Sequence, residues 1–195
     1  MNTKKKVCFL LADGAEETEV VTPVDLLRRA GVEVTLAGVR LADDAEGLSR
    51  TSHGLGLAAD VAFDGDIDGF DMVVVPGGMR GVQNLLAADE VADALRDAHA
   101  RGIWVAAICA GPWVPAKAGV LGQRPYTCYP GCQGEIDGGT NWQDRPVVID
   151  AEEKVLTSQA AGTAIPFALA IIEVLCGRPA ADQVAAAIVW KPSAR

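Results

Sequence analysis

The stretch VAAICAGP at residues 105–112 decides the fold class of this chain. Its first four residues are small and apolar, as in a strand that is buried on both faces, and its last two are typical of a turn before a helix. Similar units recur along the chain, each with a short apolar run, a glycine-containing turn and a longer stretch of helical periodicity. This alternation predicts an α/β fold with a mostly parallel sheet.

The same pattern extends the prediction over the whole chain. Strands are expected at residues 5–12, 32–37, 71–75 and 103–108, and a hairpin at 147–150 and 155–158. Helices are expected at residues 17–30, 84–86, 90–100, 163–175 and 181–189, with one more short helix that ends at residue 118. Residues 41–68 are expected to form an edge-strand excursion and a loop, and residues 121–145 an irregular segment.

Composition limits the class of protein. The chain has 195 residues, half of them hydrophobic, which suits one domain over residues 1–195. No run of about 18 apolar residues is present, and the apolar residues 7–12 lead into an acidic segment, so neither a membrane partner nor a secretory signal is expected. The net charge of −9 and the scattered basic residues argue against nucleic acid as a partner. Five cysteines, an odd number, fit a reducing cytoplasm better than a disulfide framework.

Cys109 is the candidate nucleophile. It follows an apolar strand and precedes a helix, among small residues, which is the geometry of a nucleophile elbow. The positive end of the following helix should favour thiolate, so the thiol pKa is expected below its ordinary value of about 8.5. A buried structural cysteine is the alternative reading of this segment.

A second turn is expected beside the first at the carboxyl edge of the sheet, where ligands bind in doubly wound folds. The strand that ends at Val75 is followed by Pro76, Gly77 and Gly78. Paired glycines let backbone amides approach a developing oxyanion closely, although they also suit a plain turn.

The partner of Cys109 is expected to be a carboxyl group rather than an imidazole. The chain has two histidines: His53 falls in the weakly structured region, and His99 in the helix before the Cys109 strand, at the opposite end of the sheet. Glu19 follows the first strand at the same edge as Cys109. A carboxyl group held close to a thiolate would have a raised pKa and could act as acid and base. Solvated acids at a helix start are the alternative.

Five motifs, in order, resemble the Parkinson-disease-associated protein deglycase branch of the ThiJ/PfpI superfamily. They are GAEETE at residues 14–19, PVD at 23–25 with RRAG at 28–31, VPGG at 75–78 with QNL at 83–85, AAICAGP at 106–112, and LTSQ at 156–159 with GT at 162–163. The resemblance covers residues 5–189. It implies one class I glutamine amidotransferase-like domain, a flavodoxin-like three-layer sandwich with helices on both faces of the sheet, and a homodimer without a cofactor.

The resemblance also implies roles for individual residues. Cys109 would be the nucleophile and Glu19 its protonated partner, and the Gly78 and Ala110 amides would form an oxyanion site beside Gly77. The implied activity is that of a glutathione-independent glyoxalase or protein deglycase, acting on methylglyoxal-like 2-oxoaldehydes or on glycated amino groups. The alternatives are an oxidative-stress sensor or redox-regulated chaperone that works through Cys109 oxidation, and an amide or isonitrile hydrolase of the same superfamily.

Two pocket positions depart from the family pattern. Tyr129, in TCYP at residues 127–130, stands where many members carry a histidine, and it will not titrate near pH 7. Gln159 stands where some members carry an arginine, so an anion would lose one charge-assisted partner there.

Cys128 and Cys132 allow two further readings. They could resolve a Cys109 sulfenic acid into a disulfide, or form half of a zinc site. Structural zinc needs four ligands, and the remaining candidates, Cys8 and Cys176, are expected in the core. No metal site is therefore expected.

Overall fold

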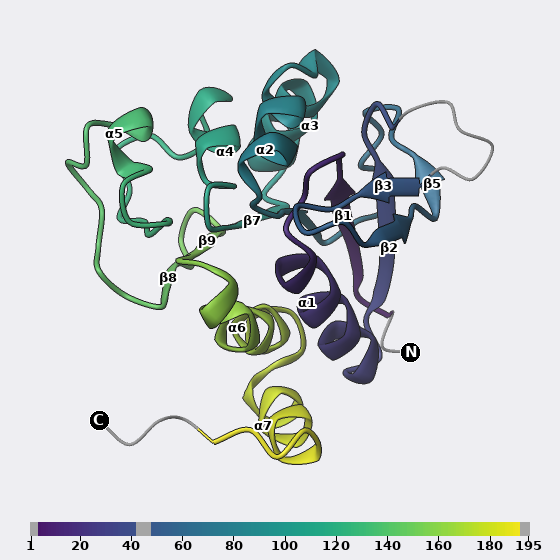
Figure 1. Ribbon diagram of the computed structural model, residues 1–195. Helices are drawn as coiled ribbons and strands as arrows, with labels where there is room; N and C mark the ends of the chain where they lie inside the picture. Colours follow the sequence, from purple (N-terminus) through teal and green to yellow (C-terminus); the bar gives the residue numbers. More distant parts are fainter. Residues whose placement is uncertain (1–3, 42–47, 192–195) are drawn as a thin grey trace.

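The computed structural model describes residues 4–41 and 48–191 (Figure 1). The strands are β1 Lys6–Leu11, β2 Glu33–Gly38, β3 Leu48–Arg50, β4 Gly56–Ala58, β5 Val61–Ala62, β6 Met72–Val75, β7 Trp104–Ile108, β8 Val147–Asp150 and β9 Val155–Ser158. The helices are α1 Glu17–Arg29, α2 Met79–Leu86, α3 Asp89–Ala100, α4 Trp113–Lys117, α5 Gln133–Ile136, α6 Ala164–Cys176 and α7 Arg178–Ala187, with a 3₁₀ turn, η1, at Ala161–Thr163.

The central sheet has the strand order β5-β2-β1-β6-β7-β9-β8. All neighbouring strands are parallel except β8, which runs antiparallel to β9. The chain first moves outward from β1 to β2 and β5, and then returns to β6 and continues in the other direction through β7 and β9. The strand order therefore reverses between β1 and β6, and the carboxyl ends of these strands mark the expected ligand site.

Helices cover both faces of this sheet. α1, α6 and α7 pack on one face and α2 to α5 on the other (Figure 1). Each interface has its own apolar core, because alternate residues of each strand point to opposite faces. The flavodoxin-like three-layer sandwich predicted from the sequence is confirmed.

The apolar pattern explains which helices lie deepest. α1 buries an apolar side that includes Val20, Val24 and Leu27 and exposes Asp25, Arg28 and Arg29 on the other, whereas Glu19 in its first turn is buried. α6 is apolar over most of its surface because it packs between the sheet, α1 and α7. Every residue of β6 is buried, as expected for a central parallel strand.

Three segments differ from the sequence-based expectation. The region 41–68 contains a separate two-stranded sheet of β3 and β4 and the edge strand β5; part of this prediction falls on residues 42–47, outside the described residues. α2 begins at Met79 rather than near residue 84, directly after the Gly78 turn. α7 begins at Arg178, not at residue 181, because Pro179 fits the first turn of a helix.

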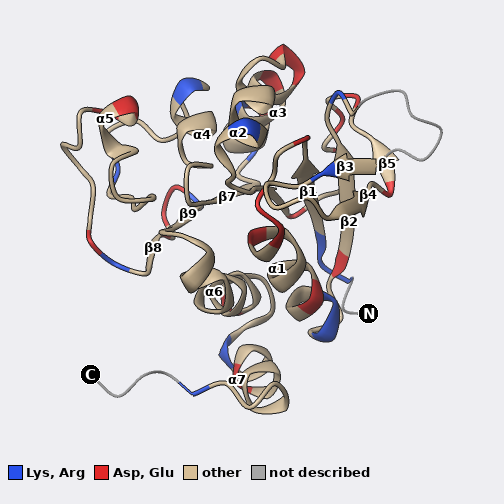
Figure 2. Cartoon of the chain, in the orientation of Figure 1, with Lys and Arg blue, Asp and Glu red and all other residues tan. Residues whose placement is uncertain are grey.

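In the described ranges, charged residues are dispersed over all layers, and lysine and arginine are spread over many elements (Figure 2). In the described part of the chain, no helix combines the length and apolar character needed to span a bilayer. The expectation that Cys176 belongs to the core is wrong: it ends α6 and is exposed, whereas Cys8 is buried in β1.

Candidate functional site

Cys109 occupies a strained turn directly after β7. Its backbone φ is 65°, a left-handed value that costs a non-glycine residue on the order of 1–3 kcal/mol. Two backbone hydrogen bonds hold it there: the Cys109 amide donates to the Ser158 carbonyl at 3.0 Å, and the Tyr129 amide donates to the Cys109 carbonyl at 2.8 Å. The turn also needs Gly111, since a β-carbon there would lie 2.6 Å from the Val75 carbonyl oxygen. The elbow predicted from the sequence is present.

Glu19 lies in the first turn of α1 and is almost completely buried, with 1% of its surface exposed. Its Oε2 accepts a hydrogen bond from the Gly77 amide at 2.9 Å, and its carboxyl group is hydrogen-bonded to the Cys109 thiol. The Glu16 carboxylate caps α1 by accepting the Glu19 amide at 2.7 Å. The start of α1 therefore fixes Glu19 against the Cys109 elbow.

Gly77 leaves the space in which these groups meet. A β-carbon at this position would lie 2.4 Å from Glu19 Oε2, 2.5 Å from Cys109 Cβ and 3.0 Å from Cys109 Sγ. All three distances show that glycine is required for the contact between the carboxyl group and the thiol. This convergence lies at the carboxyl ends of β6 and β7, beside the point where the strand order reverses.

The turn after β1 and the turn after β6 pack backbone against backbone. Gly78 has a φ of 86°, and a β-carbon on it would lie 2.2 Å from the Gly14 carbonyl oxygen. A β-carbon on Gly81 would lie 2.7 Å from the Ala15 amide nitrogen. This close approach carries the segment before α1, and with it Glu19, toward Cys109.

Burial is the main reason that the Glu19 pKa is raised, from 4.5 to about 7. The neighbouring Glu16 charge raises it further, whereas hydrogen bonds from Cys109, Gly77 and Ala161 act in the opposite direction. Glu19 is therefore a carboxyl group that changes its protonation state near neutral pH. The raised pKa predicted for it is confirmed.

The Cys109 pKa is also raised, which corrects the expectation that the following helix lowers it. Burial is the largest cause, followed by the charge of Glu19 and its hydrogen bond to the thiol; the Ala110 and Gly78 amides oppose them. α4 has only five residues and begins at Trp113, so its dipole is small and distant. While Glu19 is ionised, the proton of the pair remains on sulfur.

The structure places the other predicted pocket residues around this pair. The Gly78 and Ala110 amides interact with the Cys109 sulfur, in the place predicted for an oxyanion site. Tyr129 is 52% exposed and contributes its amide to the elbow. The Gln159 side chain donates to Asp144 Oδ1 at 2.8 Å.

Cys128 and Cys132 lie in the core on the α2 to α5 side of the sheet. Both are buried free thiols, and burial raises the Cys128 pKa to about 12. The Cys109 side chain packs instead against the core on the other side. A resolving role for Cys128 or Cys132 stays a prediction.

His53 is the residue near this site that sequence reasoning underrated. It lies in the turn between β3 and β4, where its Nδ1 contacts Glu17 Oε2 at 3.1 Å. The adjacent Ser52 amide donates to the Ala15 carbonyl at 2.9 Å, which fixes the turn to the segment before α1. No local sequence pattern predicts this contact, because the two residues are 36 positions apart in the chain.

Glu16, Glu17 and His53 are the one group in the described ranges whose potential metal-ligand atoms lie within 4.8 Å of one another. Glu16 already caps α1, and Glu17 already accepts from His53. Because these contacts satisfy the group, we assign no ion to it.

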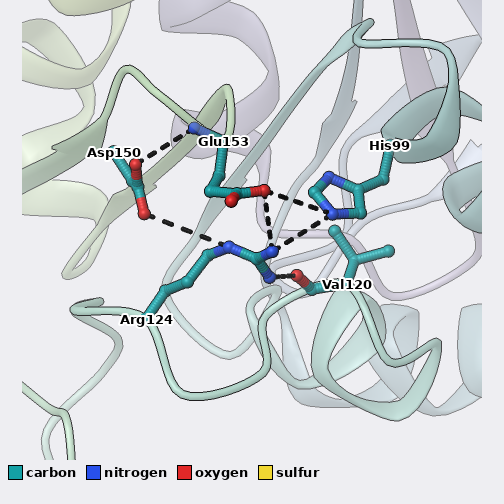
Figure 3. A network of polar contacts seen from close by, with 5 residues as sticks. All are labelled: His99, Val120, Arg124, Asp150 and Glu153. Carbon is teal, nitrogen blue, oxygen red and sulfur yellow. Dashed lines mark hydrogen bonds and ion pairs between the residues drawn. The ribbon is translucent and has the colours of Figure 1, made fainter.

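His99 lies at the other end of the sheet, as predicted. Arg124 Nη2 donates to His99 Nε2 at 3.2 Å and to Glu153 Oε2 at 2.8 Å, and Glu153 stands in the turn that precedes β9 (Figure 3). His99 therefore belongs to a polar network at the amino ends of the strands, away from Cys109.

Comparison with known proteins agrees with this geometry. A model of the DJ-1/PfpI family matches residues 5–174. The chain is 35% identical over 189 residues to the Parkinson disease protein 7 homolog of Danio rerio, covering 96% of this chain and 98% of that protein. It is 30% identical over 176 residues to the glutathione-independent glyoxalase DJ-1 of Schizosaccharomyces pombe, covering 86% and 90%. The crystal structure of Drosophila melanogaster DJ-1beta superposes with a TM-score of 0.88 at 35% identity, covering 97% of this chain and 100% of that one.

Glu19→Gln is expected to stabilise the folded protein at pH 8 and to have little effect at pH 4.5. The folded protein keeps the Glu19 proton up to about pH 7, whereas the unfolded chain loses it near the ordinary value of 4.5. Protonation of Glu19 thus favours folding fully below pH 4.5, and this contribution is lost as the pH rises through 7. The difference corresponds to at most about 3 kcal/mol. Urea unfolding at pH 4.5, 6 and 8 measures the free energies of unfolding of the unmodified protein and of the variant. A difference between them that does not change with pH would contradict a raised Glu19 pKa in the folded protein.

Gly77→Ala is expected to slow alkylation of Cys109 by at least about tenfold, because the new methyl group must separate the thiol from the Glu19 carboxylate, the base that would take its proton. Gly162→Ala is the matched control, since a β-carbon there meets nothing within 4 Å. Iodoacetamide labelling of Cys109, followed by peptide mass spectrometry, measures the rate. Equal rates in the two variants would show that the contact at Gly77 is not needed for reactivity.

Proposed function

We propose that this chain, which belongs to the DJ-1/PfpI family, converts small 2-oxoaldehydes into 2-hydroxy acids with Cys109 as nucleophile and Glu19 as proton carrier. The observation that carries the proposal is the convergence of the Cys109 thiol, the Glu19 carboxyl group and the Gly77 amide at the edge where the strand order reverses. The similarity to the glutathione-independent glyoxalase DJ-1 of Schizosaccharomyces pombe supports the choice of substrate class.

The first step is addition of the Cys109 sulfur to the aldehyde carbon. As the carbon–sulfur bond forms, the thiol proton passes to the Glu19 carboxylate and from there to the aldehyde oxygen, which yields a hemithioacetal. Glu19 suits this task because its pKa of about 7 lets it take and return a proton at neutral pH. The Gly78 and Ala110 amides are the donors available to the developing negative charge on oxygen.

The second step moves a proton within the bound substrate. Glu19 takes the proton from the former aldehyde carbon and delivers it to the neighbouring carbonyl carbon. The hydroxyl proton on the former aldehyde oxygen passes to the neighbouring oxygen, and the two transfers together convert the hemithioacetal into a thioester of a 2-hydroxy acid. Water then cleaves the thioester and restores the thiol. The sum is one 2-oxoaldehyde plus one water giving one 2-hydroxy acid, so the reaction needs no external oxidant or reductant.

The surroundings of the pair support this assignment of roles. His53 contacts Glu17 rather than Cys109. Among the described residues, Glu19 is the acid that is hydrogen-bonded to the thiol. The same addition chemistry extends to aldehyde adducts on amino groups, for which the partly exposed position of Cys109 leaves access.

The protein is further proposed to act as a homodimer, as the family resemblance implies. A groove on α1 and the adjacent strands is lined by Val20, Val21, Val24, Leu36 and Leu57. Asp25 and Arg28 also line this groove, and Val21 is 48% exposed although it is apolar. A second copy of the chain is the occupant we propose for this groove.

Incubation with methylglyoxal in the absence of glutathione is expected to give lactate. Cys109→Ser should abolish formation above background, and Glu19→Gln should reduce kcat/KM by on the order of 100-fold, as is usual when a general acid–base group is removed. For the unmodified protein, kcat/KM should rise with pH through about 7 as Glu19 ionises, and Glu19→Gln should lack this rise.

Cys176→Ser is the control for this assay, because Cys176 is an exposed thiol at the end of α6 and should not affect turnover. Absence of lactate from folded, reduced protein would overturn the enzymatic proposal. It would favour a sensor or chaperone role based on Cys109 oxidation.

Light scattering at micromolar concentration is expected to give the mass of a dimer. Val21→Glu should shift the protein to a monomer, because a charge would be buried at the interface. Val189→Glu introduces the same charge at a valine that is 77% exposed outside the groove, and it should leave the dimer intact. A monomeric unmodified protein would exclude the proposed assembly.

A further inference from the structure

The turn between β9 and α6 contains a pair of hydroxyl groups in contact. Ser158 ends β9 and Thr163 ends η1, and their hydroxyl oxygens lie 2.7 Å apart. The Thr163 hydroxyl also lies 3.0 Å from the Ala160 amide nitrogen, from which it accepts, and 2.8 Å from the Ala160 carbonyl oxygen. It thus closes the turn formed by residues 159–162.

Two residues of this segment, Ser158 and Ala161, interact with the Cys109–Glu19 pair. The Ser158 carbonyl accepts the Cys109 amide at 3.0 Å, which is one of the two hydrogen bonds that hold the strained elbow. The Ala161 amide, inside the turn, acts on the Glu19 carboxyl group and lowers its pKa. One short segment therefore positions the Cys109 backbone and supplies an amide that stabilises the ionised Glu19 carboxylate.

The two hydroxyl groups work as a unit. Together they carry two hydrogens, whereas three contacts need a donor, so only two of the three can be hydrogen bonds at one time. These contacts are with the Pro146 carbonyl at 2.8 Å, with the Ala160 carbonyl at 2.8 Å, and with each other. Ser158 is completely buried, so water cannot replace a missing partner there. Loss of the Thr163 hydroxyl also leaves the Ala160 amide without the acceptor it has in this structure.

We propose that Thr163, together with Ser158, is a positioning residue that aims the Ala161 amide at Glu19 and holds the Cys109 elbow in place. This inference rests on the proposed pairing of Cys109 with Glu19, and it assigns a role in that pair to a hydroxyl group that touches neither of them. It predicts that the reactivity of Cys109 depends on residues at the start of α6.

The expected direction of the change in the Glu19 pKa follows from the groups that surround Glu19. It faces the Cys109 thiol at the end of β7 and the Glu16 carboxylate at the start of α1, and from β6 and η1 it meets the amides of Gly77 and Ala161. An amide donor stabilises the ionised carboxylate. Withdrawal of the Ala161 amide therefore raises the Glu19 pKa further, and Glu19 then accepts the thiol proton only at higher pH.

Thr163→Val removes the hydroxyl and keeps the shape of the side chain, whereas Thr163→Ser keeps the hydroxyl. The measurement is the rate of Cys109 alkylation by iodoacetamide between pH 5.5 and 9, read on the Cys109 peptide by mass spectrometry. Thr163→Val should react about tenfold more slowly at pH 7, with the midpoint of its pH profile moved upward by roughly half a unit or more. Thr163→Ser should match the unmodified protein within about twofold.

Ser158→Ala is the second variant, in case Thr163→Val does not fold. It keeps the Ser158 carbonyl that holds Cys109 but removes the partner hydroxyl, and it should move the midpoint in the same direction. A folded Thr163→Val or Ser158→Ala with an unchanged profile overturns the proposal, even if its melting temperature falls. Alkylation needs no turnover, so absence of lactate formation would contradict the proposed function without affecting this test.

Discussion

A buried thiol and a buried carboxyl group in contact cannot both be ionised at neutral pH, and this constraint governs the site. Water stabilises two neighbouring negative charges, but the interior has a much lower effective dielectric and does not. Cys109 and Glu19 therefore carry at least one proton between them at neutral pH. Burial is the largest cause of the raised pKa of each group; the Glu19 charge raises the Cys109 pKa further, whereas the hydrogen bond from Cys109 lowers the Glu19 pKa. A pair that exchanges one proton is suited to nucleophilic addition, in which sulfur loses a proton as it gains a bond.

The fold meets this constraint through backbone contacts between three turns. The turns after β1, β6 and β7 come together because the strand order reverses between β1 and β6. Glycine at positions 77, 78 and 81 removes the β-carbons that would otherwise separate them. The left-handed Cys109 backbone is held by the Ser158 carbonyl at the end of β9 and by the Tyr129 amide. These hydrogen bonds offset the backbone strain at Cys109.

Sequence was sufficient for the fold class and for the central pair, because both follow from local patterns. The alternation of apolar runs and amphipathic stretches predicted an α/β fold with a mostly parallel sheet, and the family resemblance implied the three layers. The positions of Cys109 and Glu19 after strands placed them at one edge. The direction of the Cys109 pKa was not predictable in this way, since it depends on burial and on a neighbour 90 residues away in the chain. The contacts of His53 and Thr163 were not predicted for a related reason: they are made by turns, and turns carry little periodicity.

The replacements at Tyr129 and Gln159 show which part of the site depends least on side chains. The histidine found in many family members is absent at Tyr129, yet the Tyr129 amide still binds the Cys109 carbonyl. Gln159 is engaged with Asp144, yet the turn that it begins still presents the Ala161 amide to Glu19. Backbone donors survive such replacements because their positions are set by strand order, glycine and turn geometry. Backbone contacts therefore hold the Cys109–Glu19 pair, and the side chains of Tyr129 and Gln159 are not part of those contacts.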